Sequence, residues 1–314
     1  MTTLRLLLGG LIDYAGLFPP AGLSMAEAVR LYASYRRGRS AWALGRFVLP
    51  VARLAEFSDV AGALLPAGEG AIPWLVSALV GPDPARDLGE VLAFNARHAR
   101  IDEGRARVDA VEVRVATAEE VGAVARVFDD FSVAYEVEAR GRETEDALDA
   151  VQAAGGVAKL RTGGVTEEAV PEVSSVASFL WACAQRRVAF KLTAGLHHPL
   201  RGEYALTYEE QSPRGAMHGL LNVLVAALAA RRLAGAAGAA PATGERGEVP
   251  SIVTSILAER DARAFALHVS GVAWRTEVFS SDEVESARAT FAVSIGSCSF
   301  EEPLSELGAL GWQV

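Results

Sequence analysis

The sequence predicts an α/β fold, a (β/α)8 barrel of the TIM type, and three observations support this prediction. Short apolar segments of strand length alternate along the chain with longer segments of helical character. Such alternation is typical of a parallel sheet, and eight repeats close the sheet into a barrel. A chain of 314 residues has a suitable length for one barrel. Four of the strand segments also carry polar or charged side chains two residues apart.

Eight short segments match strands in length and apolar content. They are Arg46–Val51, Trp74–Val80, Ala110–Ala116, Ser132–Glu138, Val157–Thr162, Val188–Thr193, Phe265–Val269 and Phe291–Gly296. The seventh is the weakest of these predictions, because it is short and follows an irregular segment.

Helical segments separate the strands and follow the last one. They are Ala52–Leu65, Pro84–Ala99, Ala118–Phe128, Thr144–Ala153, Pro171–Arg186, Arg214–Leu233, Ser281–Thr290 and Pro303–Leu310. Thr117 and Ser281 each precede two acidic residues, which is typical of a helix start because negative charge there complements the helix dipole.

Residues 1–314 are expected to form a single barrel domain with two additions. Residues 1–40 hold a loop rich in proline and a helix near Met25–Arg37, and we expect this N-terminal loop-helix extension to pack on the barrel. Asp13 and Tyr14 of the loop could instead reach the barrel mouth. Residues 234–248 are mostly Ala, Gly, Pro and Thr, which predicts a flexible surface insertion.

Composition argues against several classes of partner. The formal charge of −9 and the pI near 5.2 disfavour nucleic acid, whose phosphates need a basic surface. The longest apolar stretch, Leu220–Ala230, is too short to span a membrane, and Leu4–Leu11 lacks the features of a signal peptide. Two cysteines make no disulfide framework, so we expect a cytoplasmic protein. The apolar helices allow a homo-oligomer.

The polar side chains within the strands point to function. They are Glu112, Arg114, Glu136, Glu138, Lys159, Arg161, Lys191 and Thr193. Residues two apart share one face of a strand, so these side chains face the barrel lumen if helices cover the apolar face. Buried ions are costly unless paired, so their gathering indicates an active site. The alternative is a set of antiparallel strands with one face in water, which the intervening helices disfavour.

Lys159 and Lys191 lie on consecutive predicted strands, so each is expected to lower the pKa of the other. A neutral lysine amine attacks a carbonyl carbon and forms a Schiff base. Glu112 or Glu136 would then move protons.

Four of the polar positions are expected nearest the mouth: Arg114, Glu138, Arg161 and Thr193. The two arginines would clamp a carboxylate or phosphate, which makes a small anionic, oxygen-rich metabolite the expected partner. The alternative is a structural network of salt bridges that fills the barrel floor.

Residues 154–164 and 187–195 each place a lysine between apolar residues and a following threonine and glycine. They resemble the two lysine strands of deoxyribose-phosphate aldolase and related class I aldolases, and residues 109–112 resemble the strand of the catalytic acid. The resemblance implies that Lys159 is the nucleophile, Lys191 its pKa-lowering neighbour and Glu112 the proton-transfer acid.

The chain departs from the aldolase pattern in two ways. Leu160 and Arg161 replace small hydroxyl residues, and our strand count places the lysines on strands five and six, one strand earlier than in the family. The chain is also similar to an uncharacterised bacterial barrel family.

A histidine-rich segment follows the sixth predicted strand. His197, His198 and Arg201 lie in this loop, and His218 opens the next helix. With Glu136, the three histidines form a conceivable site for a divalent metal. The other interpretation is that one histidine binds substrate or acts as a general acid or base.

Two loops could contact an anion at the mouth. Thr162 and Gly163 follow the fifth predicted strand, and Ser297 follows the eighth. Ser297 is first expected to cap the next helix, whose acidic start would repel phosphate. Cys298 is a conceivable nucleophile, but no activating base is evident in its neighbourhood of the sequence.

Three functions are therefore consistent with the sequence. The first is lysine-dependent carbonyl chemistry of the aldolase or lyase type, without a cofactor. The second is a divalent-metal-dependent lyase, isomerase or hydrolase that uses histidine and glutamate ligands. The third is a non-catalytic barrel that binds a small metabolite.

Overall fold

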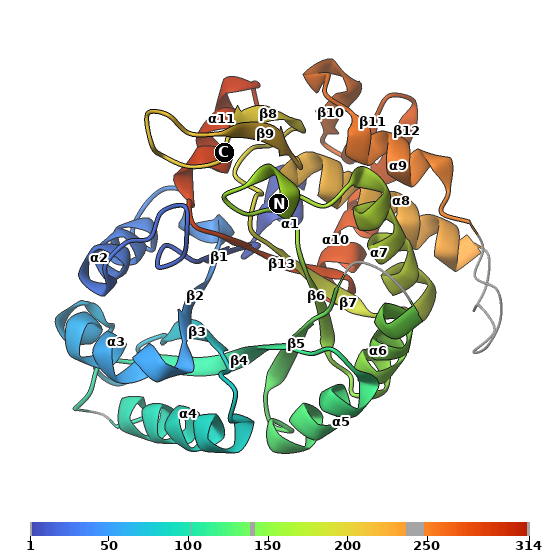
Figure 1. Ribbon diagram of the computed structural model, residues 1–314. Helices are drawn as coiled ribbons and strands as arrows, with labels where there is room; N and C mark the ends of the chain where they lie inside the picture. The colour runs from blue at the N-terminus through green and yellow to red at the C-terminus, as the bar shows by residue number, and fades with distance from the viewer. Residues whose placement is uncertain (1, 101, 139–141, 237–247, 313–314) are drawn as a thin grey trace.

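A computed structural model of the chain describes residues 2–100, 102–138, 142–236 and 248–312, and its centre is a closed barrel of parallel strands (Figure 1). The barrel strands are β1 (Ile12–Tyr14), β2 (Leu44–Pro50), β3 (Trp74–Leu79), β4 (Ala106–Arg114), β5 (Ser132–Glu136), β6 (Val157–Arg161), β7 (Ala189–Thr193) and β13 (Ala292–Ser297). Their order around the barrel is β1-β13-β7-β6-β5-β4-β3-β2. The predicted (β/α)8 fold is confirmed.

One helix follows each barrel strand on the outside. These helices are α2 (Met25–Tyr35), α3 (Leu54–Ala61), α4 (Pro84–His98), α5 (Ala118–Val127), α6 (Arg142–Ala153), α7 (Val173–Arg186), α8 (Leu220–Ala236) and α11 (Glu301–Ala309). A short helix, α1 (Thr3–Leu8), precedes β1. Thr117 caps α5 as expected, because its side chain accepts a hydrogen bond from the Glu120 amide.

The first barrel strand lies within the segment that we expected to be an extension. Ile12–Tyr14 pairs in parallel with both β13 and β2, and α2 is the helix that follows it. The expectation of a packed N-terminal extension was therefore wrong for this segment. Three residues, one of them charged, give no periodic signal, so only pairing with two longer strands defines β1.

The predicted seventh strand lies outside the barrel. It forms β10 (Phe265–His268), which pairs with β11 (Gly271–Trp274) in an antiparallel sheet completed by β12 (Glu277–Ser280). Because this sheet is antiparallel and local, its strands cannot complete a parallel barrel. With β1 counted and β10 removed, Lys159 lies on the sixth barrel strand and Lys191 on the seventh.

The connection between β7 and β13 carries most of the additional structure. A hairpin of β8 (Gly202–Ala205) and β9 (Arg214–Met217) precedes α8, and α9 (Ser251–Ala258), the three-stranded sheet and α10 (Ser281–Thr290) follow it. The start of the expected helix Arg214–Leu233 is therefore a strand. Of the insertion predicted at 234–248, residues 237–247 lie outside the described part of the chain.

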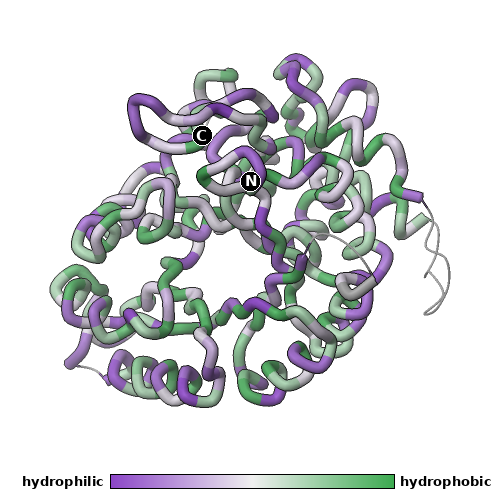
Figure 2. Tube along the Cα trace, viewed as in Figure 1, coloured by the Kyte–Doolittle hydropathy of each residue, from purple (hydrophilic) through white to green (hydrophobic). Residues whose placement is uncertain are grey.

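Apolar side chains fill the layer between barrel and helices, and polar side chains project into the barrel. Figure 2 shows the alternation of hydrophilic and hydrophobic residues along β4 and β5. Tyr14, Tyr32, Phe47 and Trp74 form an aromatic cluster between β1, α2 and the neighbouring strands. Among the described residues, no helix combines the length and apolar character needed to cross a membrane.

Candidate active site

Five ionisable side chains meet inside the barrel, each from a different strand. Asp13 comes from β1, Glu112 from β4, Glu136 from β5, Lys159 from β6 and Lys191 from β7. We call these five residues the lumen cluster. Its side chains are at most 5% exposed except that of Glu136, which is 17% exposed. The inward direction predicted for four of these strands is therefore found in the structure.

Glu112 joins the two lysines. Its Oε2 lies 2.8 Å from Lys159 Nζ and its Oε1 lies 2.7 Å from Lys191 Nζ. Lys159 also contacts Glu136 Oε2 at 2.6 Å, and Lys191 contacts Asp13 Oδ2 at 2.6 Å. The two lysines are register partners on adjacent strands. Each ammonium group thus has two carboxylate partners, and the middle carboxylate is shared.

The lumen cluster is held in place by neighbouring groups. Ser77 Oγ donates a 2.7 Å hydrogen bond to Glu112 Oε1, and the Arg46 amide donates one of 2.7 Å to Asp13 Oδ1. The Arg46 side chain binds both oxygens of Asp109. These contacts leave little rotational freedom to the carboxylates, which is what a preorganised site requires.

Ion pairing within the lumen cluster lowers the pKa of Glu112 and raises the pKa of Lys191. Burial alone would raise the pKa of Glu112, but the ammonium groups of Lys191 and Lys159 outweigh burial and lower it strongly. Burial alone would lower the pKa of Lys191, but Asp13 and Glu112 outweigh it and raise the pKa. We expected the lysines to lower each other's pKa, which is wrong for Lys191 because carboxylates lie closer to it.

A cavity of about 250 Å³ opens at the C-terminal ends of the strands, above Lys159. Its polar lining residues are Glu112, Lys159, Arg161, Thr193, His197 and Cys298. Its other lining residues are Ala15, Phe18, Pro19, Val48, Leu79, Gly164, Val165, Ala194 and Gly296. Among these described lining residues Lys159 is the one lysine, so Lys159 faces the cavity and Lys191 lies behind it.

The loop after β1 forms part of the cavity wall. Asp13 points to the lumen cluster, whereas Tyr14 packs among aromatic rings on the outside of the barrel. Ala15, Phe18 and Pro19 line the cavity. Asp13 of β1 therefore carries charge into the barrel, whereas Tyr14 packs outside it and the loop after β1 lines the cavity.

Arg114 and Glu138 do not reach this cavity. They form an ion pair of 3.4 Å with side chains 77% and 80% exposed, and they line a neighbouring open cavity of about 580 Å³ with Glu136 and Arg161. Arg161 lines both cavities and forms no ion pair with any described residue. Arg161 is therefore the arginine that a bound anion can reach.

The predicted loop residues connect strands to one another. Thr162 Oγ1 donates a 2.7 Å hydrogen bond to the Ala194 carbonyl, and Gly163 packs so closely on Gly195 that a Cβ would lie 2.7 Å from its Cα. Ser297 Oγ donates to the Ser299 carbonyl at 2.7 Å. These three residues therefore stabilise the loops around the cavity without lining it, whereas Thr193 lines the cavity.

The three histidines point in different directions. His197 Nδ1 lies 3.2 Å from Glu302 Oε2, and His198 Nδ1 lies 2.8 Å from Glu306 Oε1. His218 is fully buried, with Nε2 2.7 Å from the Pro171 carbonyl, and burial lowers its pKa to about 4.

The proposed metal ligands are therefore not brought together. Arg201 lies beside His218, at 3.4 Å, and away from the lysines. Glu136 is the partner of Lys159. Within the described residues, no group of three or more His, Cys, Asp or Glu side chains has an arrangement that could hold a metal ion.

The structure pairs residues whose contacts we did not predict. Cys298 Sγ lies 3.7 Å from His197 Nε2, and Glu302 Oε2 accepts a 2.8 Å hydrogen bond from Tyr208. Cys298 and His197 are 101 residues apart in the chain, so no local pattern links them. Asp13 is likewise 178 residues from Lys191.

The distribution of lysine along the chain is a further sequence signal for the site. Of the 30 lysine and arginine residues in the chain, only Lys159 and Lys191 are lysines. The chain uses arginine for every other positive charge and lysine only inside the barrel. This usage favours a need for the amine itself at these two positions.

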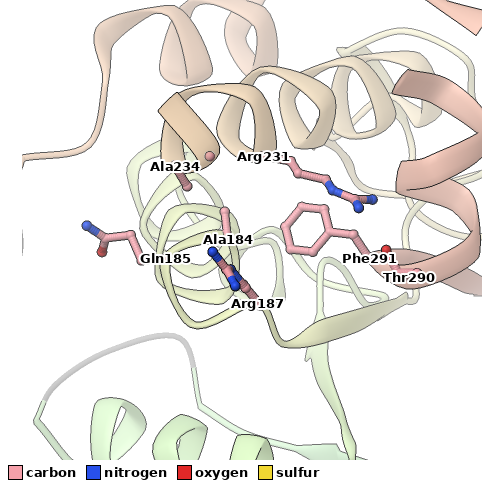
Figure 3. A pocket seen from close by; sticks show the side chains of 8 residues that line it. Ala184, Gln185, Arg187, Arg231, Ala234, Thr290 and Phe291 are labelled. Carbon is pink, nitrogen blue, oxygen red and sulfur yellow. The ribbon is translucent and has the colours of Figure 1, made fainter. Parts of the chain in front are cut away.

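Another cavity, of about 260 Å³, lies at the other end of the barrel, beside the segments that lead into β7 and β13 (Figure 3). Its lining residues are Ala184, Gln185, Arg187, Arg231, Ala234, Gly235, Thr290 and Phe291. They include two arginines but no carboxylate, lysine, histidine or cysteine. Barrels of this fold place their chemistry at the C-terminal ends of the strands, so we assign the candidate site to the mouth.

No family model and no curated protein matches the chain. The assignment of the candidate site therefore depends on the geometry described above.

Proposed function

We propose that the protein is a lysine-dependent enzyme of the aldolase or lyase type, in which Lys159 forms a Schiff base with a small anionic carbonyl compound. The observation that carries the proposal is the position of Lys159. Its amine is held by two carboxylates on the floor of an open cavity at the mouth of a (β/α)8 barrel, a fold whose members are commonly enzymes.

The first chemical step needs a neutral amine, and the lumen cluster offers a route for its proton. Lys159 Nζ lies 2.6 Å from Glu136 Oε2, and Glu136 is the most exposed carboxylate of the cluster. Glu136 is therefore suited to accept the proton and pass it to solvent. The free amine then attacks the carbonyl carbon, and the carbinolamine loses water to form the imine.

Lys191 serves as a fixed positive charge in this proposal. Asp13 and Glu112 keep it protonated, because they raise its pKa. Its ammonium group lies on the strand next to Lys159 and shares the Glu112 carboxylate with it. The strand positions also support the proposal, since the sixth and seventh barrel strands are those that carry the two lysines in the class I aldolases that the sequence resembles.

The cavity lining indicates the chemical class of the substrate. Arg161 lies at the rim without an ion-pair partner among the described residues, so it is available to a carboxylate or phosphate. Thr193 and His197 supply hydrogen-bonding groups on one side. Phe18, Val48 and other apolar residues form the opposite part of the lining, so the oxygen-rich part of the substrate is expected beside β6 and β7.

Borohydride reduction tests the proposal directly. The protein is incubated with pyruvate, acetaldehyde or dihydroxyacetone, reduced, digested and analysed by mass spectrometry. We expect the reduced adduct on Lys159, because a reduced imine is a stable secondary amine. The site of modification is simple to identify, since Lys191 and the N-terminal amine are the only other primary amines in the chain.

Lys159→Arg is the matched variant, because it keeps the positive charge between Glu112 and Glu136 but cannot form an imine. We expect it to fold and to lose the adduct. An adduct found only on Lys191 or the N-terminus, or no adduct with any of the three compounds, contradicts the proposal. Thermal unfolding of the variant separates loss of chemistry from loss of fold.

A further inference from the structure

A second reactive group lines the same cavity as Lys159. Cys298 follows the end of β13, His197 lies in the loop after β7, and Glu302 lies in the first turn of α11. Figure 1 shows α11 beside the β8–β9 hairpin over the rim of the barrel. The loops after two adjacent barrel strands therefore bring a thiol and an imidazole together at the mouth.

The side chains of Cys298, His197 and Glu302 contact one another in series. His197 Nδ1 lies 3.2 Å from Glu302 Oε2, and Cys298 Sγ lies 3.7 Å from His197 Nε2 and 3.8 Å from His197 Nδ1, so the sulfur is almost equally distant from the two ring nitrogens. Glu302 is fixed in turn by the Tyr208 hydroxyl at 2.8 Å. A thiol in contact with an imidazole that a carboxylate holds is a setting in which the imidazole can activate the thiol.

The charge state of His197 agrees with this arrangement. Burial alone would lower the pKa of His197, but its contacts with Cys298 and Glu302 outweigh burial and raise the pKa to about 9. His197 is therefore protonated at neutral pH.

The chain contains another cysteine and an adjacent histidine with which Cys298 and His197 can be compared. Cys183, the other cysteine, is fully buried in α7, and burial raises its pKa strongly. His198, the neighbouring histidine, contacts Glu306 and stacks on Tyr204 instead. Only one cysteine and one of the adjacent histidines therefore line the cavity among its described residues.

We propose that Cys298, activated by His197 and Glu302, is the group that transfers a proton to and from the substrate carbon next to the Schiff base on Lys159. This inference rests on the proposed function and names a catalytic residue for it. Asp13 and Glu112 are less suited to that step, since both are bound to the Lys191 ammonium group.

The step is a balanced proton transfer. The Cys298 thiolate takes a proton from the carbon next to the imine carbon. The electrons of that C–H bond form the C=C bond of an enamine, and the electron pair of the C=N⁺ bond moves to the Lys159 nitrogen. Reversal of the step returns the proton from the thiol to carbon.

The first experiment tests activation of the thiol without any substrate. The intact protein is treated with iodoacetamide at neutral pH, and labelling of Cys298 and Cys183 is followed by peptide mass spectrometry. We expect rapid labelling of Cys298 alone, and a rate about tenfold or more lower in His197→Gln. His198→Gln is the matched control and should label at the wild-type rate. Equal rates in the two variants would overturn the inference.

The second experiment tests the proton transfer itself. Exchange of the protons on the carbon next to the carbonyl group is followed by NMR in D2O, with whichever of the three carbonyl compounds is trapped best. Cys298→Ala and Cys298→Ser should still form the borohydride adduct on Lys159 but exchange protons about 100-fold more slowly.

The outcomes separate the two proposals. An adduct on Lys159 together with undiminished exchange in both Cys298 variants overturns this inference and leaves the Schiff base intact. The absence of any adduct in the wild-type protein overturns the proposed function, and the proton-transfer step with it, whatever the alkylation rates show.

Discussion

At the scale of single residues, the site depends on one carboxylate that serves two amines. Glu112 contacts Lys159 and Lys191 through different oxygens, so loss of Glu112 leaves both ammonium groups with one partner each. Removal of one member of a buried ion pair typically costs about 3–5 kcal/mol. Substitutions in this cluster therefore change stability as well as chemistry, which is why Lys159→Arg is preferred to a neutral variant.

His218 makes the free energy of unfolding depend on pH, and a single substitution can measure its contribution. Its pKa is lowered to about 4 in the fold, while an unfolded histidine has a pKa of 6.5, so the unfolded chain binds the proton first as the pH falls. The stabilisation from neutral His218 is complete above pH 6.5 and is lost towards pH 4. The difference in pKa corresponds to about 3 kcal/mol.

Urea unfolding at pH 7 and pH 4 measures this contribution. His218→Gln keeps a donor for the Pro171 carbonyl but does not titrate, so its loss of unfolding free energy between the two pH values should be smaller by about 3 kcal/mol. His268→Gln changes an exposed histidine and should behave as the wild type. Equal losses in His218→Gln and wild type would show that His218 is not the titrating group.

Of the candidate site, the charged side chains on the barrel strands could be predicted from the sequence. Alternation within strands is sufficient to place Glu112, Lys159 and Lys191 on the lumen face, because the period of a strand is two. Alternation does not predict which residues meet across the barrel. The contact of Asp13 with Lys191 and that of Cys298 with His197 were not predicted, since the partners are over 100 residues apart in the chain.

At the scale of elements, strand length decided what could be predicted. Strands of five to nine residues produce a visible pattern, and β2 to β7 and β13 were all expected close to their observed positions. The three residues of β1 produce none, so β10 was placed in the barrel instead. The correct assignment depends on parallel pairing of β1 with β2 and β13, which is a tertiary property.

Gly45 shows how closely β1 and β2 approach one another. A Cβ at Gly45 would overlap the Asp13 carboxylate and would lie 3.1 Å from the Gly10 carbonyl oxygen. Gly45→Ala should therefore displace Asp13 and destabilise the fold by about 1–3 kcal/mol in urea unfolding. Gly89→Ala, in the exposed middle of α4 with nothing within 4 Å, should instead stabilise by about 0.5–1 kcal/mol. Similar effects at both positions would contradict the close approach.

At the scale of the whole molecule, the N-terminal 40 residues belong to the barrel. Deletion of residues 1–40 would remove β1 and α2, open the barrel between β2 and β13, and leave Lys191 without Asp13. Because open strand edges pair with other chains, we expect the truncated protein to aggregate. Size-exclusion chromatography and thermal unfolding measure this outcome. A soluble, cooperatively folded monomer would show that β1 is dispensable.

The position of β1 also affects how the molecule matures during synthesis. The first barrel strand hydrogen-bonds to the last one, so the ring of strands is completed only when residues 292–297 have left the ribosome. Asp13 is made early and Lys191 much later, and Cys298 comes last of all. Unfinished chains therefore lack the closed ring of strands that brings Lys159 and Cys298 to one cavity.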